Sequence, residues 1–194
     1  MSPIGRALKR LTDVAVSGTA LLFGWPALLG LALAIRRDSP GPALFKQERA
    51  GRNMKPFVML KFRTMRTDAE QFGVSPESSD DPRLTRLGPW LRETSLDEVP
   101  QLWNILKGDM SLVGPRPLYL SQAREFNERE RRRLQVRPGL TGLAQIMGRG
   151  EVPHEEKLKI DVQYVERMSL WLDLRILWQT FLKGFGRQTA YQKW

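Results

Sequence analysis

The stretch VAVSGTALLFGWPALLGLALAI, residues 14–35, decides the fold of this 194-residue chain because it contains no charged residue. About 20 consecutive apolar residues are enough for a helix to cross the hydrocarbon core of a bilayer. The run is too long for the apolar part of a signal peptide, and it lacks a small-x-small cleavage site before polar sequence. We therefore expect a membrane-inserted helix near the N-terminus.

The middle and the ends of this run indicate how the helix enters the membrane. Pro26, next to Trp25, removes a backbone hydrogen bond and kinks a helix at mid-segment. Basic residues flank both ends, and positive residues prefer the cytoplasmic side. The pattern favours a re-entrant membrane helix over residues 1–38 that turns at Trp25–Pro26; a straight spanning helix or a buried core helix is the alternative. The flanking cations are Arg6, Lys9, Arg10, Arg36, Arg37, Lys46 and Arg49.

The composition is that of a globular protein with an anionic partner. A formal net charge of +10 favours nucleic acid, an anionic bilayer or a phosphorylated substrate. Residues 125–133 carry several arginines, but glutamates interleave with them, which is typical of a solvated helix face. We therefore expect no nucleic-acid partner. The chain has no cysteine, which excludes disulfides and thiolate metal sites.

Residues 39–194 predict an α+β domain that is mostly helical, with a small β-hairpin, and that forms one integrated unit with the N-terminal helix. Two short apolar-rich runs around a Gly/Asn turn indicate the hairpin. Apolar residues at helical spacing near the C-terminus indicate an amphipathic helix, either interfacial or core-facing. We expect strands at 44–49 and 57–62, helices at 101–106, 120–134 and 155–181, and loops at 67–82 and 136–150.

An adjacent pair of carboxylates, Asp97 and Glu98, stands in the stretch SLDEVPQLWN, residues 95–104. Helix-start patterns offer one explanation, because Ser95 and Glu98 match a capping box. That cap would place Pro100 at a helical position where its missing N–H costs a bond. If Asp97 is the cap instead, the proline is tolerated and the carboxylate lies at the helix N-terminus. Capping and chemistry both remain open on these residues alone.

At a helix N-terminus the free amides favour an ionised carboxylate and also attract phosphate. An ionised Asp97 is able to attack phosphorus, and Glu98 to hold Mg²⁺ or take a proton. Arginine binds phosphate oxygens in a bidentate fork, and Arg116 is the best placed because two prolines stiffen its loop. The candidate phosphate-binding residues are Lys61, Arg92, Arg116, Arg137 and Arg149.

Four ordered motifs in this chain resemble those of the bacterial sugar transferases, the monotopic phosphoglycosyl transferases that start glycoconjugate assembly. The resemblance covers about Arg6 to Lys183 and is similar to the short form, without the extra multi-helix membrane domain of larger relatives. The motifs are KFRTM (61–65), SLDEVPQLWN (95–104), KGDMS with GPRP (107–111 and 114–117) and RPGLTG (137–142).

The resemblance implies transfer of a sugar 1-phosphate from a UDP-sugar to a polyprenyl phosphate, usually undecaprenyl phosphate, with release of UMP and a requirement for Mg²⁺. It makes Asp97 the nucleophile of a ping-pong mechanism and Glu98 its partner near the metal. Arg92, Arg116 and Arg149 fall where the family places phosphate-binding or substrate-binding arginines. A catalytically silent membrane scaffold that recruits glycan enzymes is the alternative.

The resemblance also implies a place in the cell: the bacterial cytoplasmic membrane, with a re-entrant helix among the lipids and the active site on the cytoplasmic face. Downstream glycosyl transferases and a second copy of the chain are further partners to consider. Relatives commonly have Ser-Pro at the helix break, whereas this chain has Trp25–Pro26. A serine hydroxyl is able to satisfy carbonyls freed by proline, so this departure bears on the bend and not on the reaction.

Overall fold

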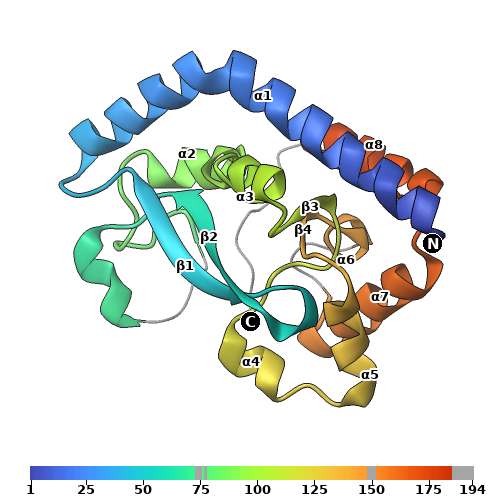
Figure 1. Cartoon of the computed structure of the whole chain (residues 1–194). Helices are drawn as coiled ribbons and strands as arrows, with labels where there is room; N and C mark the ends of the chain where they lie inside the picture. Colours follow the sequence, from blue (N-terminus) through green and yellow to red (C-terminus); the bar gives the residue numbers. More distant parts are fainter. Residues whose placement is uncertain (73–75, 77, 148–151, 185–194) are drawn as a thin grey trace.

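The computed structural model describes residues 1–72, 76, 78–147 and 152–184 (Figure 1). The prediction of a mostly helical α+β protein with a small hairpin is confirmed. Two two-stranded sheets are described, β1–β2 and β3–β4. The helices are α1 (Pro3–Asp38), α2 (Gly88–Glu93), α3 (Gln101–Lys107), α4 (Leu120–Arg124), α5 (Glu128–Arg131), α6 (Leu143–Met147), α7 (His154–Arg167) and α8 (Leu170–Gly184); the strands are β1 (Leu44–Ala50), β2 (Pro56–Phe62), β3 (Ser111–Val113) and β4 (Gly139–Thr141).

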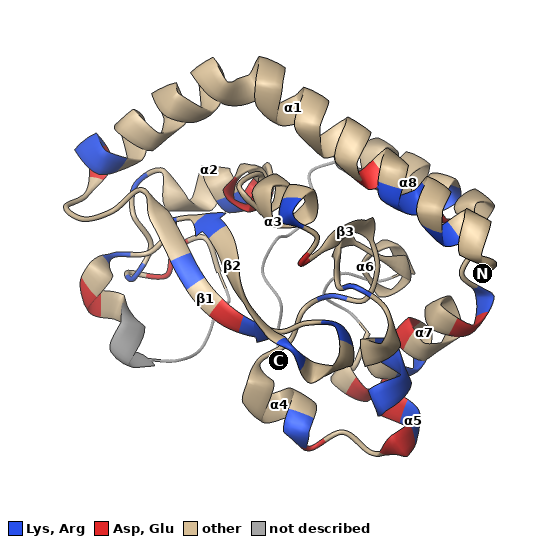
Figure 2. Cartoon of the chain, viewed as in Figure 1, with Lys and Arg blue, Asp and Glu red and all other residues tan. Residues whose placement is uncertain are grey.

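Helix α1 contains the uncharged run and extends beyond it at both ends. It begins after Ser2, whose hydroxyl accepts a hydrogen bond from the Gly5 amide, and Pro3 suits the first helical position. The helix continues through Pro26 and bends along its length (Figure 1). Charged residues lie towards its two ends and are absent from its middle (Figure 2). It is long and apolar enough to cross a membrane.

The N-terminal half of α1 is docked on the rest of the protein by polar contacts. Arg10 donates hydrogen bonds to the carbonyls of Ile105 and Leu106 at the end of α3. Lys9 pairs with Asp173 of α8 at 2.7 Å. Two of the cations that flank the apolar run are therefore bound within the protein.

The C-terminal end of α1 contacts the same globular body. Ile35 is fully buried and packs with Phe62 of β2 and Leu91 of α2. Arg63, just after β2, donates to the carbonyls of Ser39 and Pro40, which follow the helix. Because both ends are fixed to one body, α1 lies across the domain and does not stand away from it (Figure 1).

The β1–β2 hairpin is antiparallel and matches the predicted strands to within a residue or two. Its register places Phe45 opposite Lys61, Gln47 opposite Met59 and Arg49 opposite Phe57. Directly opposed residues project from the same face of a sheet. One face of the hairpin therefore carries Lys61 at one end and Arg49 at the other.

A second sheet was not predicted, because residues 136–150 look like a glycine-rich loop. Strand β4 lies within this stretch and pairs in parallel with β3. Gly139 allows the contact, since a Cβ atom there would lie 2.1 Å from the amide nitrogen of Gly114. The glycines thus indicate a close approach of two backbones and not an irregular loop.

Two predicted helices are each broken in the structure. The helix expected over 120–134 divides into α4 and α5, because Asn127 caps a new start in a capping box with Glu130. The helix expected over 155–181 divides into α7 and α8. Ser169 accepts a hydrogen bond from the Leu172 amide and so starts the second of them.

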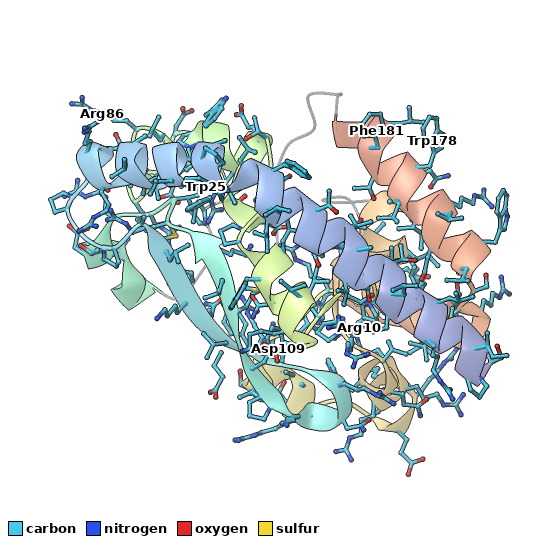
Figure 3. All side chains as sticks on the ribbon, turned by 45° about the horizontal axis from the view of Figure 1, so that its top comes forward. Arg10, Trp25, Arg86, Asp109, Trp178 and Phe181 are labelled. Carbon is cyan, nitrogen blue, oxygen red and sulfur yellow. The ribbon has the colours of Figure 1, made fainter. Side chains whose placement is uncertain are left out.

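Helix α8 is amphipathic and presents large apolar side chains to the outside, as α1 does. Trp171, Trp178 and Phe181 are more than half exposed. Figure 3 shows α8 beside α1, with Trp178 and Phe181 towards one end of α8 and Trp25 in the middle of α1. Exposed apolar patches of this kind mark membrane or partner contacts.

Candidate active site

A cavity of about 1080 Å³ lies between the hairpin, the segment after α2, the loop after β3, and the β4–α8 region. Asp97, Glu98, Lys61, Arg92 and Arg116 all line it. Five of the residues selected from the sequence are thus brought together, although they are up to 55 positions apart in the chain. We take this cavity as the candidate active site.

The carboxylate pair lies in a 3₁₀ turn, Leu96–Glu98, and not at the start of an α-helix. Ser95 adopts a left-handed conformation with φ of 57° and makes no side-chain cap bond, so the expected capping box is wrong. The cap of α3 is Pro100, so the alternative of Asp97 as cap is wrong as well. The strained Ser95 turns the chain so that both carboxylates face the cavity, and capping does not account for them.

Glu98 is held by two cations through a single carboxylate oxygen. Its Oε1 accepts from Lys61 Nζ at 2.8 Å and from Arg116 Nη2 at 2.9 Å. Burial alone would raise the pKa of Glu98, but the two cations hold that pKa well below its usual range. Glu98 also raises the pKa of Arg116. This part of the site is therefore a permanent ion cluster at neutral pH.

Asp97 differs electrostatically from its neighbour. Its side chain is buried, and Lys61 Nζ lies 3.9 Å from its Oδ2. Burial raises the pKa of Asp97; Lys61 counteracts this and Glu98 adds to it. We expected amides at a helix end to favour the charged form, but the structure has burial working against it. A poorly solvated carboxylate beside a cation is a reactive oxygen nucleophile.

One further cation, Arg92, lines the cavity, and a second, Arg133, supports the loop that carries Arg116. Arg92 Nε donates to Thr64 Oγ1 at 3.0 Å, and Arg92 is close enough to lower the pKa of Asp97. The loop that carries Arg116 is held by Arg133, which donates to the Arg116 carbonyl at 2.7 Å. Arg133 is itself buried and paired with Asp161 at 2.6 Å. Sequence reasoning missed this support, since Arg133 sits in a run of surface-like charges.

Arg137 and Arg149 stand apart from these residues. Arg137 does not line the cavity, and its Nε donates to the Gly108 carbonyl at 2.7 Å. The parallel pairing explains its position: Arg116 follows β3 whereas Arg137 precedes β4, so they lie at opposite ends of the ladder. Arg149 lies outside the described residues.

The cavity lining contains further polar and apolar side chains. Gln47, Arg49 and Tyr119 line it, which sequence reasoning missed, although the alternation of residues along β1 places two of them on the face of Lys61. Leu140 of β4 and Leu177 of α8 line it as well. The cavity is therefore able to contact both a polar and an apolar ligand.

Fold and site together define a class of protein: one that combines a long, apolar N-terminal helix with a carboxylate pair set among cations in a cavity. Residues 4–187 match the family described as bacterial sugar transferase. The chain therefore belongs to the bacterial sugar transferase family, as the four motifs indicated.

Named relatives agree with this assignment. A UDP-glucose:undecaprenyl-phosphate glucose-1-phosphate transferase of Escherichia coli (strain K12) is 41% identical over 98% of this chain and 43% of that protein. The galactosyl transferase CpsE of Streptococcus agalactiae is 42% identical over 87% of this chain and 40% of that protein. The chain thus spans less than half of these two relatives. The exopolysaccharide production protein PSS of Rhizobium leguminosarum is 43% identical and is covered over 98% of its length.

Proposed function

We propose that this protein is a phosphoglycosyl transferase that moves a sugar 1-phosphate from a UDP-sugar to undecaprenyl phosphate and releases UMP. The observation that carries the proposal is the buried Asp97 beside the Glu98–Lys61–Arg116 cluster in one cavity. The names of the relatives support the choice of donor and acceptor. The reaction would be the first membrane step in the synthesis of a glycoconjugate.

The proposed reaction has two displacements at one phosphorus atom. An Asp97 oxygen attacks the sugar-bearing phosphorus, a new P–O bond forms, and the bond to the bridging oxygen breaks. UMP leaves with that electron pair, and the sugar phosphate stays on Asp97. An oxygen of the lipid phosphate then attacks the same phosphorus and frees the Asp97 carboxylate. Lys61, Arg92 and Arg116 stabilise the negative charge on the phosphate oxygens in both steps.

The residues present fit Mg²⁺ as the cofactor. Carboxylate oxygens are the ligands that Mg²⁺ prefers, and one or two carboxylates with substrate phosphates are a common set. Asp97 and Glu98 supply such a pair, and no cluster of three or more acidic or histidine residues occurs among the residues that the structure describes. We propose that these two residues hold Mg²⁺ together with the donor. When bound, the ion neutralises the diphosphate and the leaving group.

We further propose that α1 is a re-entrant helix and that the active site faces the cytoplasm of a bacterial cell at its inner membrane. Support comes from the contacts at both ends of α1 with one body, through Arg10 and Ile35. A helix that spans the bilayer could not hold both ends on one domain. The exposed side chains of α1 and α8 would then contact lipid, at the level where the lipid phosphate lies.

The expected result of the functional test is UMP release from one member of a panel of UDP-sugars, with undecaprenyl phosphate and Mg²⁺. Labelled UMP should also exchange into that UDP-sugar without any lipid acceptor, because the first displacement is complete and reversible. UDP as the product would refute the proposal. UMP release without exchange would retain the overall reaction and refute the covalent step.

Single cysteines test the topology cleanly, since the natural chain has none. Arg6→Cys and Lys46→Cys lie at exposed positions near the two ends of α1. Both should resist a membrane-impermeant thiol reagent added to intact cells and react after permeabilisation. Labelling of Arg6→Cys alone in intact cells would refute the re-entrant topology and support a helix that spans the membrane.

A further inference from the structure

A second group of polar side chains lies in the same cavity, on β1 and just before α4. The Arg49 guanidinium carbon is 3.6 Å from the centroid of the Tyr119 ring. Arg49 Nε donates to Gln47 Oε1 at 3.0 Å, and Gln47 Nε2 donates to the Tyr119 hydroxyl at 3.1 Å. All three line the cavity. We call them the Gln47–Arg49–Tyr119 cluster.

The hairpin places this cluster further along the sheet face that carries Lys61. Lys61 is opposite Phe45, and the Cα atom of Arg49 lies four residues further along β1, about 13 Å away by the rise of a strand. Strand β1 runs from beside the end of α1 towards α4 (Figure 1), where the Ala50 amide donates to the Leu118 carbonyl. The cluster therefore lies on the side of the cavity away from α1.

Arg49 has no carboxylate of its own within salt-bridge distance in the part of the chain that the structure describes. Glu98 acts on Arg49 from further away, but it is already paired with Lys61 and Arg116. Burial lowers the pKa of Arg49 to about 10, so it remains a cation at neutral pH. A partly buried cation without a counter-ion gains most from an anionic ligand, and guanidinium suits phosphate.

Other residues of the cavity lining suit a different ligand. Leu140 and Leu177 line the cavity, and Leu177 lies on α8, which also carries the exposed Trp178 and Phe181. An isoprenoid chain fits these apolar side chains. The Gln47–Arg49–Tyr119 cluster offers instead a cation, an aromatic ring and a side-chain amide that both donates and accepts hydrogen bonds. These groups match the phosphate and the pyrimidine base of a nucleotide better than they match a lipid chain.

We propose that the Gln47–Arg49–Tyr119 cluster binds the nucleoside monophosphate part of the sugar donor and holds it on the side away from the membrane. The inference rests on the proposed function, since it takes a nucleotide sugar as the donor. Arg49 binds the phosphate that leaves with the nucleoside, and Gln47 faces the base or ribose. The cluster therefore determines which nucleotide is accepted and leaves the sugar unspecified.

The test is UMP binding to the full chain in lipid nanodiscs with Mg²⁺, measured by calorimetry, beside the Michaelis constants for both substrates. Arg49→Ala and Gln47→Leu should each weaken UMP binding by about 10-fold or more, as expected for loss of hydrogen bonds that involve charge. In both variants the KM for the UDP-sugar should also rise, whereas the KM for undecaprenyl phosphate should stay unchanged. Arg52→Ala removes the same charge three positions on, outside the cavity, and should bind UMP like the wild type.

The outcomes separate this inference from the proposed function. Wild-type UMP affinity in both variants overturns the inference but leaves the reaction intact. A rise in the KM for undecaprenyl phosphate alone assigns the cluster to the lipid phosphate and also overturns it. A wild-type protein that neither binds nor releases UMP refutes the proposed function itself. If Arg49→Ala does not fold, Arg49→Lys is measured instead, because it keeps the charge and loses the bidentate geometry.

Discussion

Asp97→Asn abolishes turnover, by an expected factor of about 10³ or more, and at the same time raises the thermal stability of the protein at neutral pH. Activity is lost because an amide does not attack phosphorus. Stability rises because the buried carboxylate is replaced by a neutral group of the same size. The pKa of Asp97 is raised by burial, so its ionisation in the folded state works against folding.

The sign of the pH dependence follows from that raised pKa. The contribution of Asp97 to stability is fully present below its ordinary pKa of about 3.9 and is lost as the pH rises through its higher folded pKa. The Tm advantage of Asp97→Asn should therefore grow with pH over this window and then level off. Wild-type activity should fall on the acid side at a higher pH than for an ordinary carboxylate.

Melting curves and UMP release over a pH series measure both effects. Asp109→Asn is the matched control, because Asp109 pairs with Lys107 outside the cavity and should leave turnover unchanged. Intact-mass measurement on wild type given donor without lipid should detect the sugar phosphate adduct, which the Asp97→Asn variant lacks. Turnover of more than a few per cent in that variant would remove Asp97 as the nucleophile.

Glu98→Gln should also eliminate most of the activity. Like Asp97→Asn it replaces a carboxylate by an amide, but it should destabilise the protein where Asp97→Asn stabilises it. Glu98 is the carboxylate that Lys61 and Arg116 share, so its loss leaves two cations close together without their counter-ion. Removing one partner of a buried ion pair costs about 3–5 kcal/mol, and the partial exposure of Arg116 reduces the expected loss to about 2 kcal/mol.

The Glu98 contribution has the opposite pH dependence to that of Asp97. Its pKa is lowered in the folded state, so its stabilising effect is present above its ordinary pKa and is lost only in strong acid. Denaturant unfolding at pH 7 and pH 5 should give the same loss for Glu98→Gln. Glu166→Gln, which breaks an exposed pair with Arg132, should cost less than about 1 kcal/mol. Equal stability of Glu98→Gln and wild type would contradict the ion cluster.

The hairpin and the carboxylate pair were predictable because their signals are local. Alternating strands around a Gly/Asn turn need no distant partner to be recognised. The acids of residues 95–104 form an unusual pattern beside Pro100. What local patterns did not predict was the conformation of Ser95, whose positive φ replaces the expected cap with a 3₁₀ turn.

The arginines show where local reasoning ends. Arg116 and Arg137 both stand next to a proline and were both candidate phosphate-binding residues, with Arg116 the better placed between its two prolines. Their positions differ because β3 and β4 pair in parallel. Arg116, which follows β3, contacts Glu98, whereas Arg137, which precedes β4, contacts Gly108. This pairing joins residues almost 30 positions apart, and a three-residue strand is too short to show the alternation of apolar and polar residues by which a strand is predicted.

The buried Asp13 makes helix α1 a structural part of the candidate active site. Its carboxylate accepts hydrogen bonds from the Leu112 amide and the Ser111 hydroxyl, and so holds strand β3. The loop with Arg116 begins immediately after that strand. A chain shortened to remove α1 would lose the acceptor for these groups, so it would be a damaged catalyst and not a soluble version of the same one. Solubilisation strategies for this protein should therefore shield α1 and keep it.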